Sequence, residues 1–598
     1  MDFSASFVIP FVIGCAVMFS VIAYKYVRWS LRLPKRDKIL VKKNFWSTET
    51  LKGIGEAVSE CLLHRRIFKI NPVLGYMHMS LATGWFLLIV AGWVETAVYL
   101  GGKMAPLHGH VFFKYFMQDT PHRTLWGIDF NNVMDALLLL VLSGVALAWF
   151  KRLKSRMLGM KRTTRHTAGD RAAMSALWFV FPLRLAAESI TAALYANGGF
   201  LTGTIGAFLA ERISPDTLTV MQQAAWWCYS TALGVFFVAM PFSRYMHIFT
   251  EVPLIFMRRW GIKSSEKQSS FDRFQTEACS RCGICIDPCQ LQSAAGIRDV
   301  QSVYFIRDRR YGKLTDRVAD TCLMCGRCES KCPVGLELNT LRLNSREAMH
   351  GTPADNRYAY AETADRSSGE GKVGYFAGCM TLLSPKILVA MDDIFKAAGE
   401  EVWHADRDGG VCCGRPLKLS GEVDAARRMM QINKNLFAKH GIETLVTSCP
   451  ICLKVFREDY NLQGIEVLHH SEYIERLVKS GRISPVHKNT RLTYHDPCEL
   501  GRGCGVYEAP RNVLRAAATL LEPAQNREDA LCCGASLSAT TLSNKQQTAI
   551  ARDMTAQLQA TGAEAIVTAC PLCKKTIARQ TDRPVLDIAE VISGSLKS

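Results

Sequence analysis

Cysteine is scarce in the first half of this 598-residue chain. Only Cys15, Cys61 and Cys228 precede position 279, and the remaining 19 of the 22 cysteines lie between Cys279 and Cys573. These later cysteines form short Cys-x-x-Cys groups within a large chain, which excludes the disulfide framework of a small secreted protein. The grouping therefore predicts metal-binding sites in a reducing compartment.

The chain also lacks a Gly-x-Gly-x-x-Gly motif after a predicted strand, so we predict that any flavin must come from a partner. Acidic residues are few relative to basic ones, and the formal net charge is +18. The basic residues gather in segments 28–72 and 151–171, beside apolar runs, whereas a nucleic-acid surface would need a basic face on a folded soluble domain. This placement predicts no nucleic-acid partner.

Five apolar stretches have about the 20 residues needed to cross the hydrocarbon core of a membrane. They lie near 5–27, 75–100, 131–150, 173–196 and 224–250. The first stretch lacks a basic start, which predicts a retained anchor and not a cleaved signal peptide. Because basic loops stay on the cytoplasmic side, we expect a protein of the cytoplasmic (inner) membrane whose N-terminus is outside and whose later half is cytoplasmic.

Histidines inside membrane spans are costly in lipid and are therefore functional candidates. We expect His78, near the start of the second stretch, and His247, near the end of the fifth, at matching depth on the cytoplasmic side. Two facing imidazoles at that depth suit one b-type haem, and two interfacial histidines without haem are the alternative. His64, in the basic loop, is interpreted as a surface histidine.

The sequences His78-Met-Ser-Leu-Ala-Thr-Gly-Trp and Met-Pro-Phe-Ser-Arg-Tyr-Met-His247 resemble the cytochrome b subunits of the nitrate reductase gamma family. The resemblance implies a five-helix transmembrane bundle that exchanges electrons with a quinone. Members of that family often carry a second, outer haem. The depths of its ligands hold Leu88 and Tyr229 here, so we expect one haem b.

Arg184 and Glu188 lie one helical turn apart in the fourth stretch. Pairing on one helix face would lower their cost in lipid. The functional alternative is a cofactor contact between Arg184 and a haem propionate, or a proton route to a quinone through Glu188.

Two runs of cysteines follow the membrane part. The first run is Cys279, Cys282, Cys285 and Cys289, and the second is Cys322, Cys325, Cys328 and Cys332, before Pro333. At these spacings three thiolates of a run bind one [4Fe–4S] cube and the fourth crosses to the other cube, so we predict two cubane clusters. A structural zinc site would need only four ligands in two pairs. The long insertion between the runs predicts extra helices around the clusters.

An internal repeat of about 120 residues fills the rest of the chain. Its cysteines are Cys379, Cys412, Cys413, Cys449 and Cys452 in the first copy, and Cys498, Cys532, Cys533, Cys570 and Cys573 in the second. In each copy a β-rich run ends at a cysteine that proline follows, which places thiolates at the carboxyl end of a strand, where α/β sheets bind ligands.

Adjacent cysteines do not suit one compact cube, which favours a bridged or opened cluster in each copy. Zinc sites or buried thiols are the alternative. His495 is interpreted as a turn residue, with proton donation beside Cys498 as its alternative. Cys504 lies outside the pattern and has no predicted role.

The repeat resembles the CCG domains of heterodisulfide reductase catalytic subunits, and residues 270–598 resemble their fused ferredoxin and double-CCG arrangement. The resemblance implies one or two non-cubane [4Fe–4S] clusters at the catalytic CCG cysteines and cleavage of a disulfide between them. We therefore predict four domains: a membrane cytochrome b-like domain at 1–255, a helical dicluster ferredoxin domain at 256–370, and α/β CCG domains at 371–485 and 486–598.

Two functions fit these features. In the first, a membrane-bound oxidoreductase passes electrons between menaquinone, haem b and a CCG head that reduces a disulfide substrate to thiols. In the second, the CCG head accepts electrons from an electron-transfer flavoprotein and the chain passes them to menaquinone. An electron-transfer subunit of a hydroxyacid oxidase would share the CCG architecture but would leave the fused membrane domain unexplained.

Overall fold

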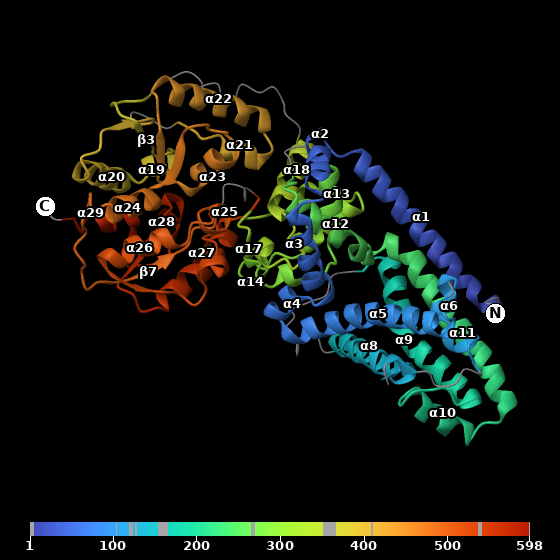
Figure 1. Ribbon diagram of the computed structural model, residues 1–598. Helices are drawn as coiled ribbons and strands as arrows, with labels where there is room; N and C mark the ends of the chain where they lie inside the picture. Colours follow the sequence, from blue (N-terminus) through green and yellow to red (C-terminus); the bar gives the residue numbers. More distant parts are fainter. Residues whose placement is uncertain are drawn as a thin grey trace. The chain divides into compact units, whose positions relative to one another are not determined.

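The computed structural model forms two compact units. The first consists of Met1–Ser264 and Ser269–Gly283, and the second of Ser265–Gln268 and Ile284–Ser598. In Figure 1 the colours run from blue to green through the first unit and on to red through the second. The structure describes residues 5–102, 105–118, 124–125, 128–153, 166–264, 269–350, 366–407, 411–535 and 541–596.

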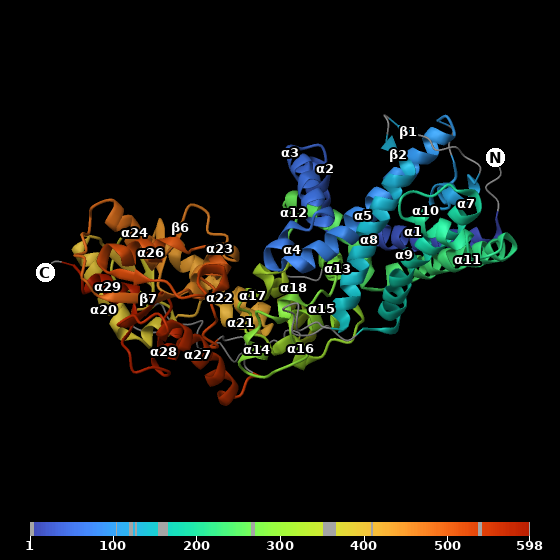
Figure 2. The same cartoon turned by 90° about the horizontal axis from the view of Figure 1, so that it is seen from below.

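Five helices in the described part of the first unit are long and apolar enough to cross a membrane, as the sequence predicted. They are α1 (Ile9–Leu31), α5 (Pro72–Tyr99), α8 (Phe130–Leu153), α9 (Ala168–Tyr195) and α11 (Pro215–Ala239). Helix α5 packs along α8, and α11 packs along both α9 and α1, which Figure 2 shows from below. These contacts make one bundle.

Local signals set where these helices begin. The Asn71 side chain accepts a hydrogen bond from Leu74 N ahead of Pro72 at the start of α5, and Ser214 caps α11 ahead of Pro215. Proline suits the first helical position because its missing N–H would have no partner there. Thr167 and Asp170 form a reciprocal capping box at the start of α9.

The fifth span ends earlier than the predicted stretch at 224–250. Two 3-10 turns, Met240–Phe242 and Arg244–Met246, separate α11 from α12 (His247–Arg259). Pro241 cannot donate a helical hydrogen bond, and Ser243 is extended, so the long helix cannot continue. His247 is therefore the first residue of α12 and does not lie inside the fifth span.

Shorter elements complete the first unit. They are α2 (Lys35–Asn44), α3 (Thr48–Ala57), a π-helical turn (Val58–Leu62), α4 (Arg65–Ile70), α6 (Leu107–Val111), α7 (Phe113–Phe116), the paired strands β1 (Thr124–Leu125) and β2 (Ile128–Asp129), α10 (Thr202–Ala210) and α13 (Ser270–Ala278). Helix α13 packs against α12 and α1. This packing attaches the segment before Cys279 to the membrane unit.

The second unit begins with short helices around the cysteine runs. They are α14 (Gln290–Ser293), α15 (Ser302–Arg310), α16 (Asp316–Asp320), α17 (Arg327–Ser330) and α18 (Leu338–His350). Three of them, α14 to α16, lie in the insertion between the two runs. The predicted extra helices are therefore present.

The two copies of the repeat have the same sheet topology. The first sheet has the order β4-β3-β5-β6 and the second β10-β9-β7-β8, and all of their pairings are parallel. The strands are β3 (Val373–Phe376), β4 (Val402–His404), β5 (Thr444–Thr447), β6 (Glu466–His469), β7 (Arg491–His495), β8 (Thr519–Leu521), β9 (Ala565–Thr568) and β10 (Val585–Asp587). Read from β4 and from β8, the two orders are equivalent.

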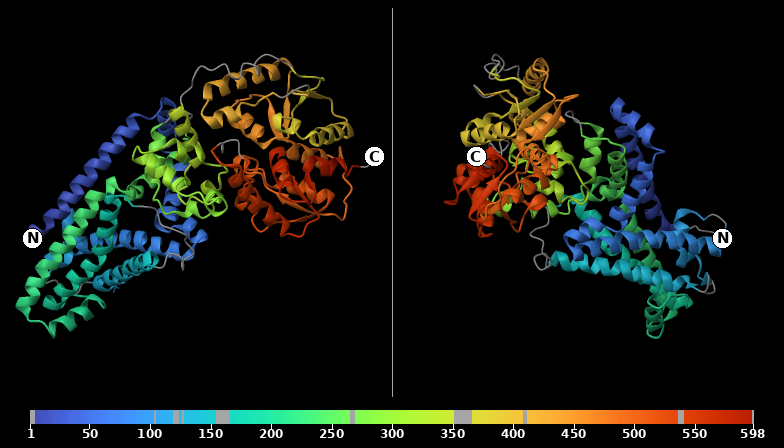
Figure 3. Two further views of the ribbon diagram at one scale, coloured as in Figure 1. Left: turned by 180° about the vertical axis from the view of Figure 1, so that it is seen from behind. Right: turned by 60° about the vertical axis from the view of Figure 1, so that its left-hand side comes forward.

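The copies share one hydrophobic core. Ile394 and Ile474 of the first copy and Leu514 and Ile592 of the second are fully buried in it. Figure 3 shows the first copy, in yellow and orange, lying against the second, in red. The helices are α19 (Cys379–Leu382), α20 (Pro385–Ala397), α21 (Arg415–Ser420), α22 (Val423–Lys439), α23 (Pro450–Glu458), α24 (His470–Lys479), α25 (Gly501–Cys504), α26 (Glu508–Ala517), α27 (Asn544–Gln559), α28 (Pro571–Ala578) and α29 (Ile588–Ser593).

Helices α1 and α11 approach so closely that a side chain at Gly234 has no room. A Cβ atom there would lie 2.4 Å from the carbonyl oxygen of Pro10. We expect Gly234→Val to lower the free energy of unfolding by about 1–3 kcal/mol, measured by thermal unfolding in detergent, because backbone must move to admit the side chain. Gly92→Ala, whose Cβ would meet nothing closer than 3.4 Å, is the control. Equal stability of both variants would contradict this packing.

Candidate metal centres

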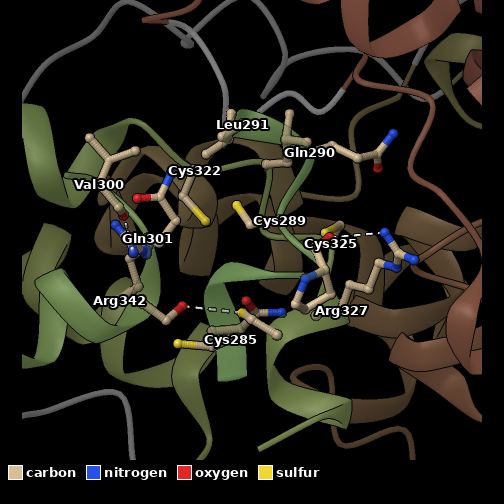
Figure 4. A pocket seen from close by; sticks show the side chains of 16 residues that line it. Cys285, Cys289, Gln290, Leu291, Val300, Gln301, Cys322, Cys325, Arg327 and Arg342 are labelled. Carbon is tan, nitrogen blue, oxygen red and sulfur yellow. Dashed lines mark hydrogen bonds between the residues drawn. The ribbon is translucent and has the colours of Figure 1, made fainter. Parts of the chain in front are cut away.

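Three cysteines of the second run and the last two of the first run line one pocket. They are Cys285, Cys289, Cys322, Cys325 and Cys328. Figure 4 shows Cys289 and Cys322 turning their sulfur atoms toward each other. Cys289 thus lies beside cysteines of the second run, and its binding to their cube stays a prediction.

These thiols are placed where their negative charges would repel. Burial, together with the neighbouring Cys322 and Cys325, raises the pKa of Cys289 to about 12. Burial and the same neighbours raise the pKa of Cys328 well above its ordinary value. Thiolates gathered in this way are stabilised by a positively charged metal group, so the donor set fits an iron–sulfur cluster.

The geometry suits a cluster better than a single ion. Among the residues that the structure describes, no three His, Cys, Asp or Glu side chains lie close enough together to bind one metal ion. Five thiols instead line one space, together with Val300, Leu323 and Arg342. A cube of iron and sulfur has its own volume and fills such a space, whereas zinc draws its ligands onto one point.

The first cysteine run is divided between the two units. Cys279 and Cys282 belong to the first unit, and Cys285 and Cys289 to the second. The assembly of Cys279, Cys282 and Cys285 with Cys332 around the other cube therefore stays a prediction.

In the first repeat copy, Cys449 caps the start of α23 directly after β5, as predicted. Cys413, Cys449 and Cys452 are buried, whereas Cys379 is exposed at the start of α19. Hydrogen bonds from Cys412 and Cys452 lower the pKa of Cys413 well below its ordinary value. Cys413 is therefore the cysteine of this site toward which two neighbouring thiols donate.

The second copy repeats this arrangement. Cys570 follows β9 and caps α28, and Cys532, Cys533, Cys570 and Cys573 are all buried. The sulfur atoms of Cys533 and Cys573 are 3.4 Å apart. Hydrogen bonds from Cys532 and Cys573 lower the pKa of Cys533 well below its ordinary value, so Cys533 corresponds to Cys413.

The glycine after each cysteine pair has a structural role. Gly414 has φ +82° and Gly534 has φ +81°, a conformation that glycine adopts without strain. Their N–H groups point at the sulfur atoms of Cys412, at 3.4 Å, and Cys532, at 3.5 Å. Backbone donors aimed at sulfur favour its negative charge, so the Cys-Cys-Gly sequence makes a turn that holds thiolates.

The cysteine sites of the two copies face each other. A hydrogen bond with Cys573 lowers the pKa of Cys570, but burial and the charge of Cys449, from the other copy, raise it above its ordinary value. Helix α19 of the first copy packs against α28 of the second, and Leu572 lies against both cores. The two sites therefore meet across the boundary between the copies.

The second copy also touches the pocket of the cysteine runs. A hydrogen bond from Cys532, with help from the positive charge of Arg502, lowers the pKa of Cys325 to about 6. The Gln290 side chain bonds both the N–H of Cys532, at 2.7 Å, and its carbonyl oxygen, at 3.3 Å. Arg502 donates to Cys325 O at 2.7 Å and to Ala530 O at 2.9 Å. Sequence reasoning missed Gln290 and Arg502 because neither lies in a motif.

His495 is the last residue of β7 and not a turn residue. Its Nδ1 lies 3.2 Å from Thr568 Oγ1 and its Nε2 lies 3.2 Å from Leu531 O. Burial lowers the pKa of this histidine. Both ring nitrogens are engaged, so His495 anchors the loop before Cys532 and has no nitrogen left for a substrate.

Three histidines gather near the start of α5. His64, His247 and His78 lie close enough to interact electrostatically, and the rings of His64 and His78 are stacked at 5.5 Å. His64 is therefore not the isolated surface residue that the sequence suggested; its left-handed backbone (φ +51°) turns it toward His78. The Nδ1 of His247 lies 2.8 Å from Arg244 O, a contact that fixes the orientation of the ring.

The predicted Arg184–Glu188 pair is present in α9, with Arg184 Nε 2.8 Å from Glu188 Oε1 and both side chains buried. Leu88 and Tyr229 are buried in the bundle. Glu95 is buried, its Oε1 has no hydrogen-bond partner among the residues that the structure describes, and no sequence pattern singled it out.

Comparison with known proteins agrees with this interpretation of the second unit. Residues 373–457 and 492–578 match the family model of the cysteine-rich domain CCG, and residues 275–336 match that of a 4Fe-4S dicluster domain. EtfAB:quinone oxidoreductase of Syntrophomonas wolfei is 23% identical over 87% of this chain and 88% of its own length.

Two further relatives cover less of the chain. One subunit of the dihydromethanophenazine:CoB--CoM heterodisulfide reductase of Methanosarcina barkeri is 24% identical over 54% of this chain and 94% of its own length. A probable membrane-anchored ferredoxin of Chromohalobacter salexigens is 32% identical over 35% of this chain and 32% of its own.

The fold, the cysteine sites and these relatives define an oxidoreductase that carries 4Fe-4S clusters. More particularly, its second half is similar to the heterodisulfide reductase polypeptide of Methanosarcina barkeri, and five apolar helices precede it. Both family matches lie after residue 274, so the resemblance of the membrane part to cytochrome b subunits stays a prediction.

The crossed pocket makes a specific prediction. We expect Cys289→Ser to remove the same low-temperature EPR signal as Cys322→Ser, because both thiols face one pocket, and to lower the iron content by up to about four atoms per chain. Cys504→Ser, outside the pattern, is the control and should keep full iron content. Loss of the signal that Cys282→Ser removes would contradict the crossing.

Proposed function

We propose that this chain is a membrane-bound, quinone-linked oxidoreductase that relays electrons from an electron-transfer flavoprotein to menaquinone. The observation that carries the proposal is the extent of one relative. The EtfAB:quinone oxidoreductase spans 87% of this chain, and so both units, whereas the heterodisulfide reductase polypeptide spans 54%. A protein with both halves needs both a soluble electron donor and a membrane acceptor.

The second unit supports a route for electrons through its cysteine sites. Clusters held by these cysteines would carry electrons one at a time. Because Cys379 is exposed, a soluble partner could reach the first CCG site. Cys449 of that site lies near Cys570 of the second CCG site, so electrons could pass from one site to the other. Cys532 then adjoins Cys325 of the dicluster pocket, where Gln290 and Arg502 fix the spacing.

For the first unit we propose a haem b site at its cytoplasmic end, with His78 and His247 as ligands. The two histidines come from different helices, and the hydrogen bond from His247 Nδ1 to Arg244 O orients the His247 ring. The haem would pass electrons to menaquinone in the membrane. Arg184 and Glu188 form an ion pair with each other. A contact between Arg184 and a haem propionate, or a proton route through Glu188, would be a second role in addition to this pairing.

The haem ligands can be tested by substitution. We expect His78→Ala and His247→Ala each to abolish the b-type absorbance of the purified protein, because an imidazole on each side of the iron is required, while iron–sulfur content is unchanged. His64→Ala should keep the haem, because the proposal gives His64 no bond to the iron and only a stacking contact with the ring of His78. Loss of haem in His64→Ala and its retention in His247→Ala would show that the ligands are His64 and His78.

A disulfide reductase is the second candidate, and the facing CCG sites favour it. The Cys449 and Cys570 sites meet across the boundary between the copies, so a disulfide bound between them would have one sulfur near each. Cleavage of the S–S bond would consume two electrons and two protons and release two thiols. The electrons would then come from menaquinol and travel in the opposite direction.

Steady-state kinetics of the purified, detergent-solubilised protein separate the two functions. The proposal predicts that reduced electron-transfer flavoprotein supports reduction of a menaquinone analogue, and that a disulfide is not reduced by the corresponding quinol. Cys379→Ser should slow the flavoprotein reaction because it damages the exposed CCG site. Turnover with quinol and a disulfide, without flavoprotein activity, would overturn the proposal in favour of the second candidate.

A further inference from the structure

One buried carboxylate in the first unit joins three separate segments. Asp170, at the start of α9, forms an ion pair with Arg281, which lies between Cys279 and Cys282, and both side chains are completely buried. The same carboxylate accepts a hydrogen bond from the N–H of Arg244 at 2.8 Å, three residues before His247. It also accepts bonds from the N–H and hydroxyl of Thr167, at 3.0 and 2.7 Å.

The cysteine loop itself does not require an arginine at this position. Arg281 occupies the third place of its Cys-x-x-Cys loop with φ +55°, and Met324 occupies the same place in the second run with φ +53°. Both loops therefore use the left-handed conformation, whatever the side chain. Met324 is buried without a charge. The difference between the loops is that only Arg281 can reach a carboxylate.

Stability alone does not account for the ion pair. Burying a carboxylate and a guanidinium costs desolvation that their attraction barely repays, and apolar replacements are often as stable. The capping box of α9 needs only Thr167 and Asp170. The link to Arg281 thus adds a fixed geometry and not a required cap.

We propose that Asp170 is a positioning residue that holds the Cys279–Cys282 loop against the segment carrying His247. The inference rests on the proposed function insofar as His247 binds haem, but the positioning itself is a property of the chain. Helix α13, just before the loop, supplies a second attachment, because the Phe274 ring lies 4.9 Å from Trp29 and 5.7 Å from Tyr26. The aromatic contact places the helix, and the ion pair orients the loop beyond it.

The consequence concerns electron transfer between the cluster bound by this loop and the haem. Electron tunnelling slows exponentially as the gap between two redox centres widens, so a loop that moves away from the haem transfers electrons more slowly. A loop tied by a buried ion pair would keep the gap constant. A loop held only by α13 would sample longer distances.

The test uses the full-length protein with its cofactors and four variants. Arg281→Met copies the residue of the second run, Asp170→Asn removes the charge but keeps an acceptor, Arg281→Lys keeps the charge, and Thr167→Ala breaks the cap but keeps the ion pair. Clusters are reduced by photoexcited deazaflavin, which needs no physiological donor, and haem reduction is followed optically. Iron and haem contents are measured on the same samples.

We expect Arg281→Met and Asp170→Asn to keep their iron and haem but to slow haem reduction several-fold. Arg281→Lys should recover part of the rate, and Thr167→Ala should remain near wild type. Wild-type rates in Arg281→Met and Asp170→Asn would overturn the proposal, since the pair would then be a contact without a positioning role.

Hydrogen–deuterium exchange separates failure of this inference from failure of the proposed function. The N–H of Arg244 is bonded to Asp170, so peptides containing Arg244, and those containing residues 279–283, should exchange faster in Arg281→Met than in wild type. This readout does not depend on haem. A wild-type protein without haem would defeat the proposed function, and faster exchange in Arg281→Met would still support the positioning role; unchanged exchange would defeat that role as well.

Discussion

Thiolates repel one another at close range, and the second unit is organised around holding them together. Cys289 and Cys328 line one pocket, where burial and the neighbouring Cys322 and Cys325 raise the pKa of both thiols. Hydrogen bonds from Cys412 and Cys452 lower the pKa of Cys413. Backbone N–H groups at Gly414 and Gly534 and the helix starts after Cys449 and Cys570 all direct positive ends of dipoles at sulfur. Iron supplies the remaining charge compensation.

The same sheet is used twice with different surroundings. Both copies end a strand at a cysteine and begin a helix at proline, but the first leaves Cys379 exposed and the second buries its site against Cys325 and Gln290. Equivalent topology therefore gives one site open to partners and one site coupled to the dicluster pocket. This difference makes the two cysteine sites inequivalent although their sheets are alike.

The sequence predicted those features that depend on spacing along the chain. Cysteine offsets predicted that Cys289 belongs with the second run, and it lines one pocket with three cysteines of that run. The strand–Cys–Pro pattern predicted the ends of β5 and β9. Five apolar helices followed from length and hydropathy. The sequence predicted too late an end for the fifth helix, because apolar residues continue past Pro241. The helix stops there because proline has no N–H to donate.

Contacts between single polar residues far apart in the sequence were beyond such reasoning. Gln290 and Cys532 are 242 residues apart, and nothing local marks Gln290 as a partner. Arg281 sits in a cysteine loop where spacing constrains only the cysteines, and Asp170 reads as an ordinary capping residue. His64 turns toward His78 through a left-handed backbone that its neighbours do not signal. Tertiary structure alone brings these pairs together.

The central claim is that the cysteine sites and the histidine site form one conducting chain from a soluble donor to the membrane. The most direct measurement is a single-turnover reaction in which the anaerobic protein is mixed with reduced electron-transfer flavoprotein and without quinone, while EPR follows the clusters and absorbance follows the haem. The account predicts that the clusters and then the haem become reduced within one mixing. Reduction of the clusters with the haem left oxidised, or no reduction at all, would contradict it.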